Sequence, residues 1–91
     1  MALLFTGYWQ AAADYTCDAT VRWVECTADA TVTLPNIAKI PVTRTITVIN
    51  NNKKVTVAAA TGQMIMGAAT AAVAKGDRIT IMSNGLYWVV V

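Results

Sequence analysis

Residues 28–35, A-D-A-T-V-T-L-P, decide the fold class of this chain. Apolar side chains at positions 30, 32 and 34 alternate with threonines at 31 and 33, so the two sets fall on opposite sides of an extended backbone. This period of two is typical of a β-strand, and Pro35 ends it because proline has no N–H for the ladder. The runs 44–50 and 53–59 repeat the pattern, which predicts a β-rich module.

Further strand-like runs surround this segment at intervals of roughly 8–12 residues, the spacing of a sandwich or barrel. We expect strands at 15–18, 20–27, 63–66, 68–74, 78–82 and 86–91. The asparagines at 50–52 predict a turn that pairs the strands on either side, and S-N-G at 83–85 predicts a hairpin. No fixed-period repeat is visible, so a solenoid is not expected.

The expected fold is therefore all-β, a small antiparallel sandwich or barrel of about eight short strands. We expect residues 14–91 to form this β-module and residues 1–13 to form an N-terminal arm outside it. A chain of 91 residues forms one domain at most.

Hydrophobic residues make up 56% of the chain and charged residues only 13%. Average chains have roughly 45–50% apolar and 25% charged residues, and a small domain buries little of its surface. We therefore expect a homo-oligomer in which contacts between copies complete the core. The alternative is a monomer whose surface is rich in alanine.

The charge pattern argues against two classes of partner. The net charge is only +2, Lys53-Lys54 is the single basic pair, and no basic stripe with interleaved aromatic residues is present, so a nucleic-acid partner is not expected. No apolar run approaches the roughly 20 residues of a membrane helix, so we expect no membrane partner. The apolar start is short and lacks a positive leader, and we do not interpret it as a signal peptide.

The first ten residues are rich in large apolar side chains without helical or strand periodicity. We predict that this arm binds another protein. An equally open alternative is that its aromatic residues pack on their own module. The predicted partner-binding residues are Leu3, Leu4, Phe5, Tyr8 and Trp9.

The C-terminal run 86–91, L-Y-W-V-V-V, is apolar on both faces. An uncovered strand of this kind promotes aggregation, so we expect it to be central in a sheet or covered by a partner. Trp23, Tyr87, Trp88 and Val90 are the predicted contacts between copies, because aromatic residues anchor interfaces. A sugar-stacking platform made by the three aromatic residues is the alternative.

Residues that carry chemistry are scarce. The chain has no histidine, and its glycines are single, so neither a histidine base nor a phosphate-binding loop is expected. Asp14 and Asp18 flank a predicted strand, but a calcium loop needs a denser set of oxygens. Two cysteines are too few for a disulfide scaffold, so we expect Cys17 and Cys26 to be free and buried, with a disulfide across adjacent strands as the alternative. No histidine is present to activate a thiol as a nucleophile. We predict no enzyme activity, no metal and no cofactor.

The order of motifs resembles a β-module of tailed-bacteriophage virion proteins. The resemblance rests on T-A-D-A-T-V-T-L-P, then T-I-T-V-I-N-N-N-K-K-V-T-V, a break between Gly62 and Gly67, and G-D-R-I-T-I-M-S-N-G-L-Y-W-V-V-V. It covers about residues 14–91, with S-N-G-L-Y-W at 83–88 as the closing element. The first thirteen residues and the two cysteines lie outside the family pattern.

The resemblance implies a trimer with a structural or adhesive role on a virion and without catalytic residues. We expect a capsid decoration protein that binds the major capsid protein, or another virion protein, through its N-terminal arm at the capsid surface. A module at the tip of a tail fibre or spike, binding a host receptor, is the alternative. A small hydrolase or redox protein that uses Cys17 or Cys26 is a third hypothesis.

Overall fold

A computed structural model of the chain describes the backbone of residues 2–5 and 7–91, and the side chains from Gly7 onward. It confirms an all-β fold, interrupted by one short 3-10 helix, η1 (Ile37–Lys39). The strands are β1 (Ala2–Phe5), β2 (Tyr8–Ala11), β3 (Tyr15–Thr16), β4 (Trp23–Cys26), β5 (Ala30–Thr33), β6 (Thr45–Asn50), β7 (Val55–Ala58), β8 (Thr70–Val73), β9 (Arg78–Ser83) and β10 (Trp88–Val90).

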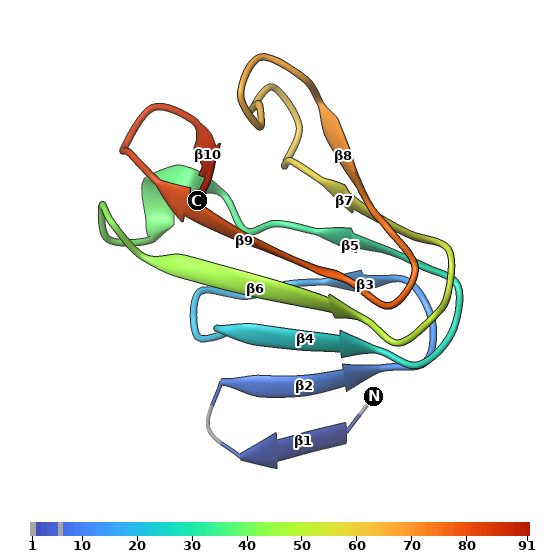
Figure 1. Ribbon diagram of the computed structural model, residues 1–91. Helices are drawn as coiled ribbons and strands as arrows, with labels where there is room; N and C mark the ends of the chain where they lie inside the picture. Colours follow the sequence, from blue (N-terminus) through green and yellow to red (C-terminus); the bar gives the residue numbers. More distant parts are fainter. Residues whose placement is uncertain (1, 6) are drawn as a thin grey trace.

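The strands form two sheets that pack as a sandwich (Figure 1). Sheet A has six strands in the order β1-β2-β4-β6-β9-β10, and sheet B has four in the order β3-β5-β7-β8. The segment predicted as an N-terminal arm supplies β1 and β2, which continue sheet A beyond β4.

The sheets are mixed, whereas the sequence predicts antiparallel pairing. From β2 to β7 the chain passes alternately from sheet A to sheet B, so β2, β4 and β6 pair in parallel, as do β3, β5 and β7. This winding is solenoid-like. Its first coil runs from Tyr8 to Trp23, but its second runs from Trp23 to Thr47 because the loop that carries η1 is inserted. Unequal coils leave no fixed period in the sequence, so the winding was not predicted.

The remaining strands close the sandwich with antiparallel pairs. The hairpin predicted at 83–85 is confirmed, since β9 and β10 pair across it. The predicted pairing of β6 with β7 is wrong because these strands lie in different sheets. The predicted strand at 63–66 is also wrong. Only Ile65 makes isolated bridges there, to Ala68 and Trp88.

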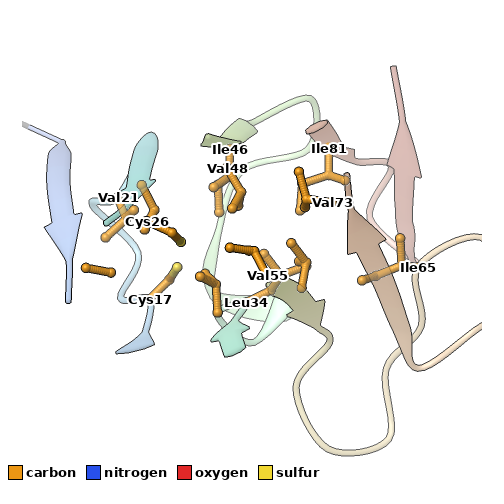
Figure 2. Packing of buried hydrophobic residues seen from close by; sticks show 14 of the residues in the cluster. Cys17, Val21, Cys26, Leu34, Ile46, Val48, Val55, Ile65, Val73 and Ile81 are labelled. Atoms are coloured by element: carbon orange, nitrogen blue, oxygen red, sulfur yellow. The ribbon is translucent and has the colours of Figure 1, made fainter. Parts of the chain in front are cut away.

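The core lies between the sheets and is built by the inward positions of the strands (Figure 2). The alternation predicted these positions: Val32 in β5, Ile46 and Val48 in β6, and Val57 in β7 are all buried. Ile37 of η1 is also a member of this core. Burial of such side chains stabilises the fold by roughly 1.5–3 kcal/mol each.

One buried polar side chain joins the ends of three strands. The Asn50 Nδ2 group donates hydrogen bonds to the carbonyl oxygens of Lys53 at 2.6 Å, Val73 at 2.9 Å and Ala74 at 3.2 Å. Its Oδ1 accepts a bond from the Lys53 N–H at 2.6 Å. The turn signal at 50–52 therefore marks a crossing between sheets, where Asn50 holds β6, the start of β7 and the end of β8 together.

Candidate functional site

The outer face of sheet A carries an aromatic pair near its N-terminal edge. Tyr8 of β2 and Trp23 of β4 are register partners, and their ring centroids lie 6.4 Å apart at a tilt of 32°. Alternation along β4 turns Val24 and Cys26 into the core, which leaves Trp23 outside with 39% of its surface exposed. The parallel pairing of β2 with β4 thus brings together two aromatic residues from distant parts of the sequence.

The next row of the same face is polar. Gln10 and Glu25 are register partners, and the Gln10 Nε2 group donates to Glu25 Oε1 at 3.2 Å. Partial burial raises the pKa of the Tyr8 hydroxyl, and the charge of Glu25 and a hydrogen bond with it raise the pKa further. We call Tyr8, Trp23, Gln10 and Glu25 the aromatic ledge. Aromatic rings beside amide and carboxylate groups form a surface suited to contacts with proteins or sugars.

The other predicted arm residues are placed differently. Leu3, Leu4 and Phe5 belong to β1, and their side chains lie outside the described part of the molecule. Trp9 is half-buried, packs against the core and places its ring 6.1 Å from that of Tyr15. Trp9 therefore packs on its own module, which was the alternative prediction for the arm, whereas Tyr8 lies on the outer face of the sheet.

A second surface lies where the chain ends. Eight large hydrophobic residues are exposed among the described side chains. Seven of them lie in the loops next to β10, in β10 itself or at the last residue of the chain. We call them the C-terminal corner: Val42, Met64, Met66, Leu86, Tyr87, Val90 and Val91. A groove of about 610 Å³ runs between the loop 62–67 and the segment 86–89.

Local backbone geometry shapes this corner. Met66 has a φ of 49° and Gly67 a φ of 86°, so the chain turns back sharply after Ile65 enters the core. The turn leaves Met64 and Met66 pointing outward on either side of Ile65. Across the groove, the Val90 N–H lies 3.3 Å from the Met66 sulfur. The sequence does contain a signal for this surface: no charged residue occurs in 55–74 or 79–91.

The predicted contact residues between copies divide between these two surfaces and the interior. Trp23 lies on the aromatic ledge, while Tyr87 and Val90 lie in the C-terminal corner. Trp88 is completely buried in the core of its own chain, so its prediction as a contact between copies is wrong. A sugar-stacking platform made by Trp23, Tyr87 and Trp88 is wrong for the same reason.

The strand 86–91 is neither central nor enclosed. Its regular part, β10, is the edge strand of sheet A, and Val90 and Val91 are exposed. Trp88 faces inward because hairpin pairing places it opposite the buried Ser83. A sequence that is apolar on both faces did not show which face turns inward.

The two cysteines are free and buried, as predicted. Figure 2 shows both side chains in the core, Cys26 at the end of β4 and Cys17 just after β3. Burial raises the pKa of the Cys17 thiol to about 12 and that of Cys26 to about 11. The thiolate, which is the nucleophilic form, is therefore strongly disfavoured at both positions.

The carboxylates of Asp18 and Asp14 accept hydrogen bonds from backbone N–H groups. Asp18 Oδ1 accepts bonds from the Thr20 hydroxyl at 2.6 Å and the Thr20 N–H at 2.8 Å, and these bonds lower the pKa of Asp18. Asp14 Oδ1 accepts instead from the Thr31 N–H at 2.8 Å, across sheet B. Within the described residues, no three cysteine or carboxylate groups come together as a metal site.

No protein-family model matches this chain, and a search of curated proteins found no significant match. Within the described residues, no helix has the length and apolar character needed to cross a bilayer.

Proposed function

We propose that the chain is a non-enzymatic structural protein of a virion, a decoration protein that attaches to the capsid surface of a tailed bacteriophage. The aromatic ledge is the observation that carries this proposal. Tyr8 and Trp23 form a partly exposed ring pair on the outer face of sheet A. Exposed aromatic residues of this kind are the commonest anchors of protein interfaces.

The ledge also suits the N-terminal position that we predicted for attachment. Tyr8 comes from the segment predicted to bind the shell, and Trp23 joins it through the β2–β4 pairing. Because β2 is part of sheet A, the attachment surface is held rigidly rather than on a loose arm. Rigid presentation lowers the entropy lost on binding. The proposed partner is the major capsid protein or another protein of the shell.

The location on the virion can be tested directly. An antibody raised against the purified chain is applied to virions made by cells that carry the gene, and labelling is located by electron microscopy. The proposal expects label over the capsid surface. Label confined to the tail tip would replace it with the alternative, and unlabelled virions would overturn both.

The ledge itself can be tested by quantitative binding of the purified chain to particles that lack it. Tyr8→Ala with Trp23→Ala should weaken binding at least tenfold, since aromatic hot spots contribute about 2 kcal/mol or more. Thr45→Ala, an exposed change on β6, is the matched control and should leave binding unchanged. Equal binding by the double variant would refute the assignment of the ledge.

The tail-tip alternative is favoured by one feature of the same site. A ring pair beside the Gln10–Glu25 hydrogen bond offers both stacking and polar contacts, which is the chemistry that recognises a surface glycan. A tip module should compete with whole phage for host cells. A decoration protein should not.

A further inference from the structure

The C-terminal corner is the most apolar exposed surface of the described molecule. Leu86 projects from the β9–β10 loop with 81% of its surface exposed, and Met66 and Tyr87 lie beside it with 59% and 42% exposed. Val42 joins the same surface, since its Cγ2 atom lies 3.1 Å from where a Cβ on Gly85 would stand. Contiguous apolar surface on a small protein marks a site that another molecule covers.

The distribution of charge limits what that molecule can be. No charged side chain occurs in 55–74 or 79–91, which supply all of the corner except Val42. Seven of the twelve charged residues instead lie in the connections β2–β3, β4–β5, β6–β7 and β8–β9 or at the start of β9. Figure 1 shows these connections at one end of the sandwich, away from β10. The charge-free segments of the corner offer no counter-charge to a nucleic acid or an anionic lipid surface, and basic residues, Lys39 and Arg44, flank only Val42.

The corner also combines a projection and a recess on one face. Leu86 is the projection, and it also forms part of one wall of the groove of about 610 Å³. The same wall includes Tyr87 and Val89, and the facing wall is glycine and methionine from the loop 62–67. Glycine leaves room for an incoming side chain, and methionine adapts its shape to apolar partners. A surface that carries both features can receive Leu86 from another molecule of the same kind.

The sheet edge beside the corner is already paired within the chain. β10 is the edge strand of sheet A, but the Trp88 N–H donates to the Met64 carbonyl and the Trp88 carbonyl accepts from the Met66 N–H, both at 2.9 Å. Contact between copies at the corner would therefore rest on side chains and not on strand pairing. It would also point the charged ends of both molecules away from the contact, into water.

We propose that a second copy of this chain covers the C-terminal corner, with Leu86 of each copy seated in the groove of its neighbour. The inference rests on the proposed function only in that a capsid decoration protein is expected to act as an oligomer. It assigns contact between copies to the corner and leaves the aromatic ledge free for the shell. Trp23, predicted as a contact between copies, is not part of this interface.

Sedimentation velocity and light scattering of the purified chain test the proposal. The wild type should have a mass that is a multiple of the 9.7 kDa of one chain. Leu86→Asp and, separately, Met66→Asp should raise the dissociation constant about 100-fold and yield single chains. Trp23→Asp, at the one large exposed hydrophobic residue outside the corner among the described side chains, should keep the wild-type mass.

Circular dichroism and thermal unfolding establish that the variants are folded, which is expected because both corner side chains are more than half exposed. Three results would overturn the proposal: a wild type that is a single chain at micromolar concentration, two corner variants that keep the wild-type mass, or equal dissociation by Trp23→Asp. A wild type that remains a single chain would indicate a different protein or a small apolar ligand as the occupant.

This experiment is independent of the virion test. Dissociation by Leu86→Asp together with unlabelled virions would refute the proposed function and retain the interface. If virions were labelled over the capsid but neither corner variant dissociated the oligomer, the proposed function would stand and the proposed interface would be refuted.

Discussion

Asn50 shows how much of the sandwich depends on a single side chain. It is buried, and its amide links β6 to Lys53 before β7 and to the end of β8 through four hydrogen bonds of 2.6 to 3.2 Å. Buried polar groups that lose their partners cost about 1–3 kcal/mol each. A residue that satisfies several backbone groups at once is therefore more important than its polar character suggests.

Asn50→Ala should lower the free energy of unfolding by about 2–3 kcal/mol, because the Val73 carbonyl and the Lys53 N–H lose their amide partner. Urea unfolding at one fixed protein concentration measures the change. Asn51→Ala, at the exposed neighbouring asparagine, should change it by less than about 0.5 kcal/mol. If the two variants lowered the free energy of unfolding equally, the buried hydrogen bonds of the Asn50 amide would contribute nothing to stability.

The buried thiol of Cys17 predicts a loss of stability at alkaline pH. Its pKa rises from 9.0 to about 12 on folding, so the unfolded chain releases this proton at lower pH than the folded chain. Stability is therefore complete below about pH 9 and falls as the pH rises toward 12, by at most about 1.4 kcal/mol per pH unit for this thiol.

The measurement is urea unfolding between about pH 8 and pH 11, a range that begins below the unfolded-state pKa of the thiol and covers most of the interval up to its folded-state pKa. The free energy of unfolding of Cys17→Ala should fall less over this pH range than that of the wild type. Part of the fall remains, because the pKa values of Cys26 and Tyr15 are also raised in the folded chain. If the free energy of unfolding depended on pH identically in Cys17→Ala and the wild type, the Cys17 thiol would not be the cause of the alkaline destabilisation. A thiol reagent added at neutral pH should modify neither cysteine until the chain unfolds.

At the residue scale, the sequence predicted inward positions well where alternation was clean. Val32, Val48 and Val57 are buried as expected. It failed for Trp88, because a run that is apolar on both faces carries no information about which face is covered. The pairing of Tyr8 with Trp23 was also invisible, since it depends on a parallel register between distant strands.

At the scale of elements, Gly7 controls the entry into the coil. It adopts a φ of 80° between β1 and β2, and its carbonyl accepts bonds from the N–H groups of Arg22 and Trp23 at 2.8 and 2.9 Å. A Cβ at this position would stand 3.2 Å from the Thr20 carbonyl oxygen. Both its conformation and its close backbone contact therefore favour glycine.

Gly7→Ala should destabilise the chain by more than the roughly 1–2 kcal/mol of left-handed strain, because the new methyl group also meets backbone. Gly76→Ala separates the two effects, since Gly76 has a φ of 75° and a Cβ added there would meet no atom within 4 Å. Thermal unfolding compares the two variants. If Gly76→Ala destabilised the chain as much as Gly7→Ala, the contact with the Thr20 carbonyl would contribute nothing to the cost of the Gly7 substitution.

The existence of strands was largely predictable, but their partners were not. A period of two identifies a strand and its faces, whereas the choice of neighbour depends on how the chain passes between sheets. The asparagine turn at 50–52 marked a real change of direction, yet that turn crosses to the other sheet instead of forming a hairpin. The prediction of a hairpin at 83–85 was correct because a short turn places the following strand directly beside β9.

At the scale of the molecule, β6 joins the two halves of the topology. It pairs in parallel with β4 of the coil and antiparallel with β9, whose residues lie far away in the sequence. Such non-local pairing must close long loops before it gains contacts, so folding is slow for a chain of this length. We expect refolding in milliseconds to seconds.

The central position of β6 leads to a prediction about the folding pathway. Val48 in β6 and Val73 in the edge strand β8 are both buried valines, so truncation removes the same atoms from each. If β6 pairs with its neighbours in the transition state, Val48→Ala should slow refolding about fivefold, whereas Val73→Ala should mainly accelerate unfolding. Stopped-flow fluorescence of the tryptophans, of which Trp88 is fully buried, measures both rates. Equal slowing of refolding by the two variants would place β8 in the folding nucleus as firmly as β6.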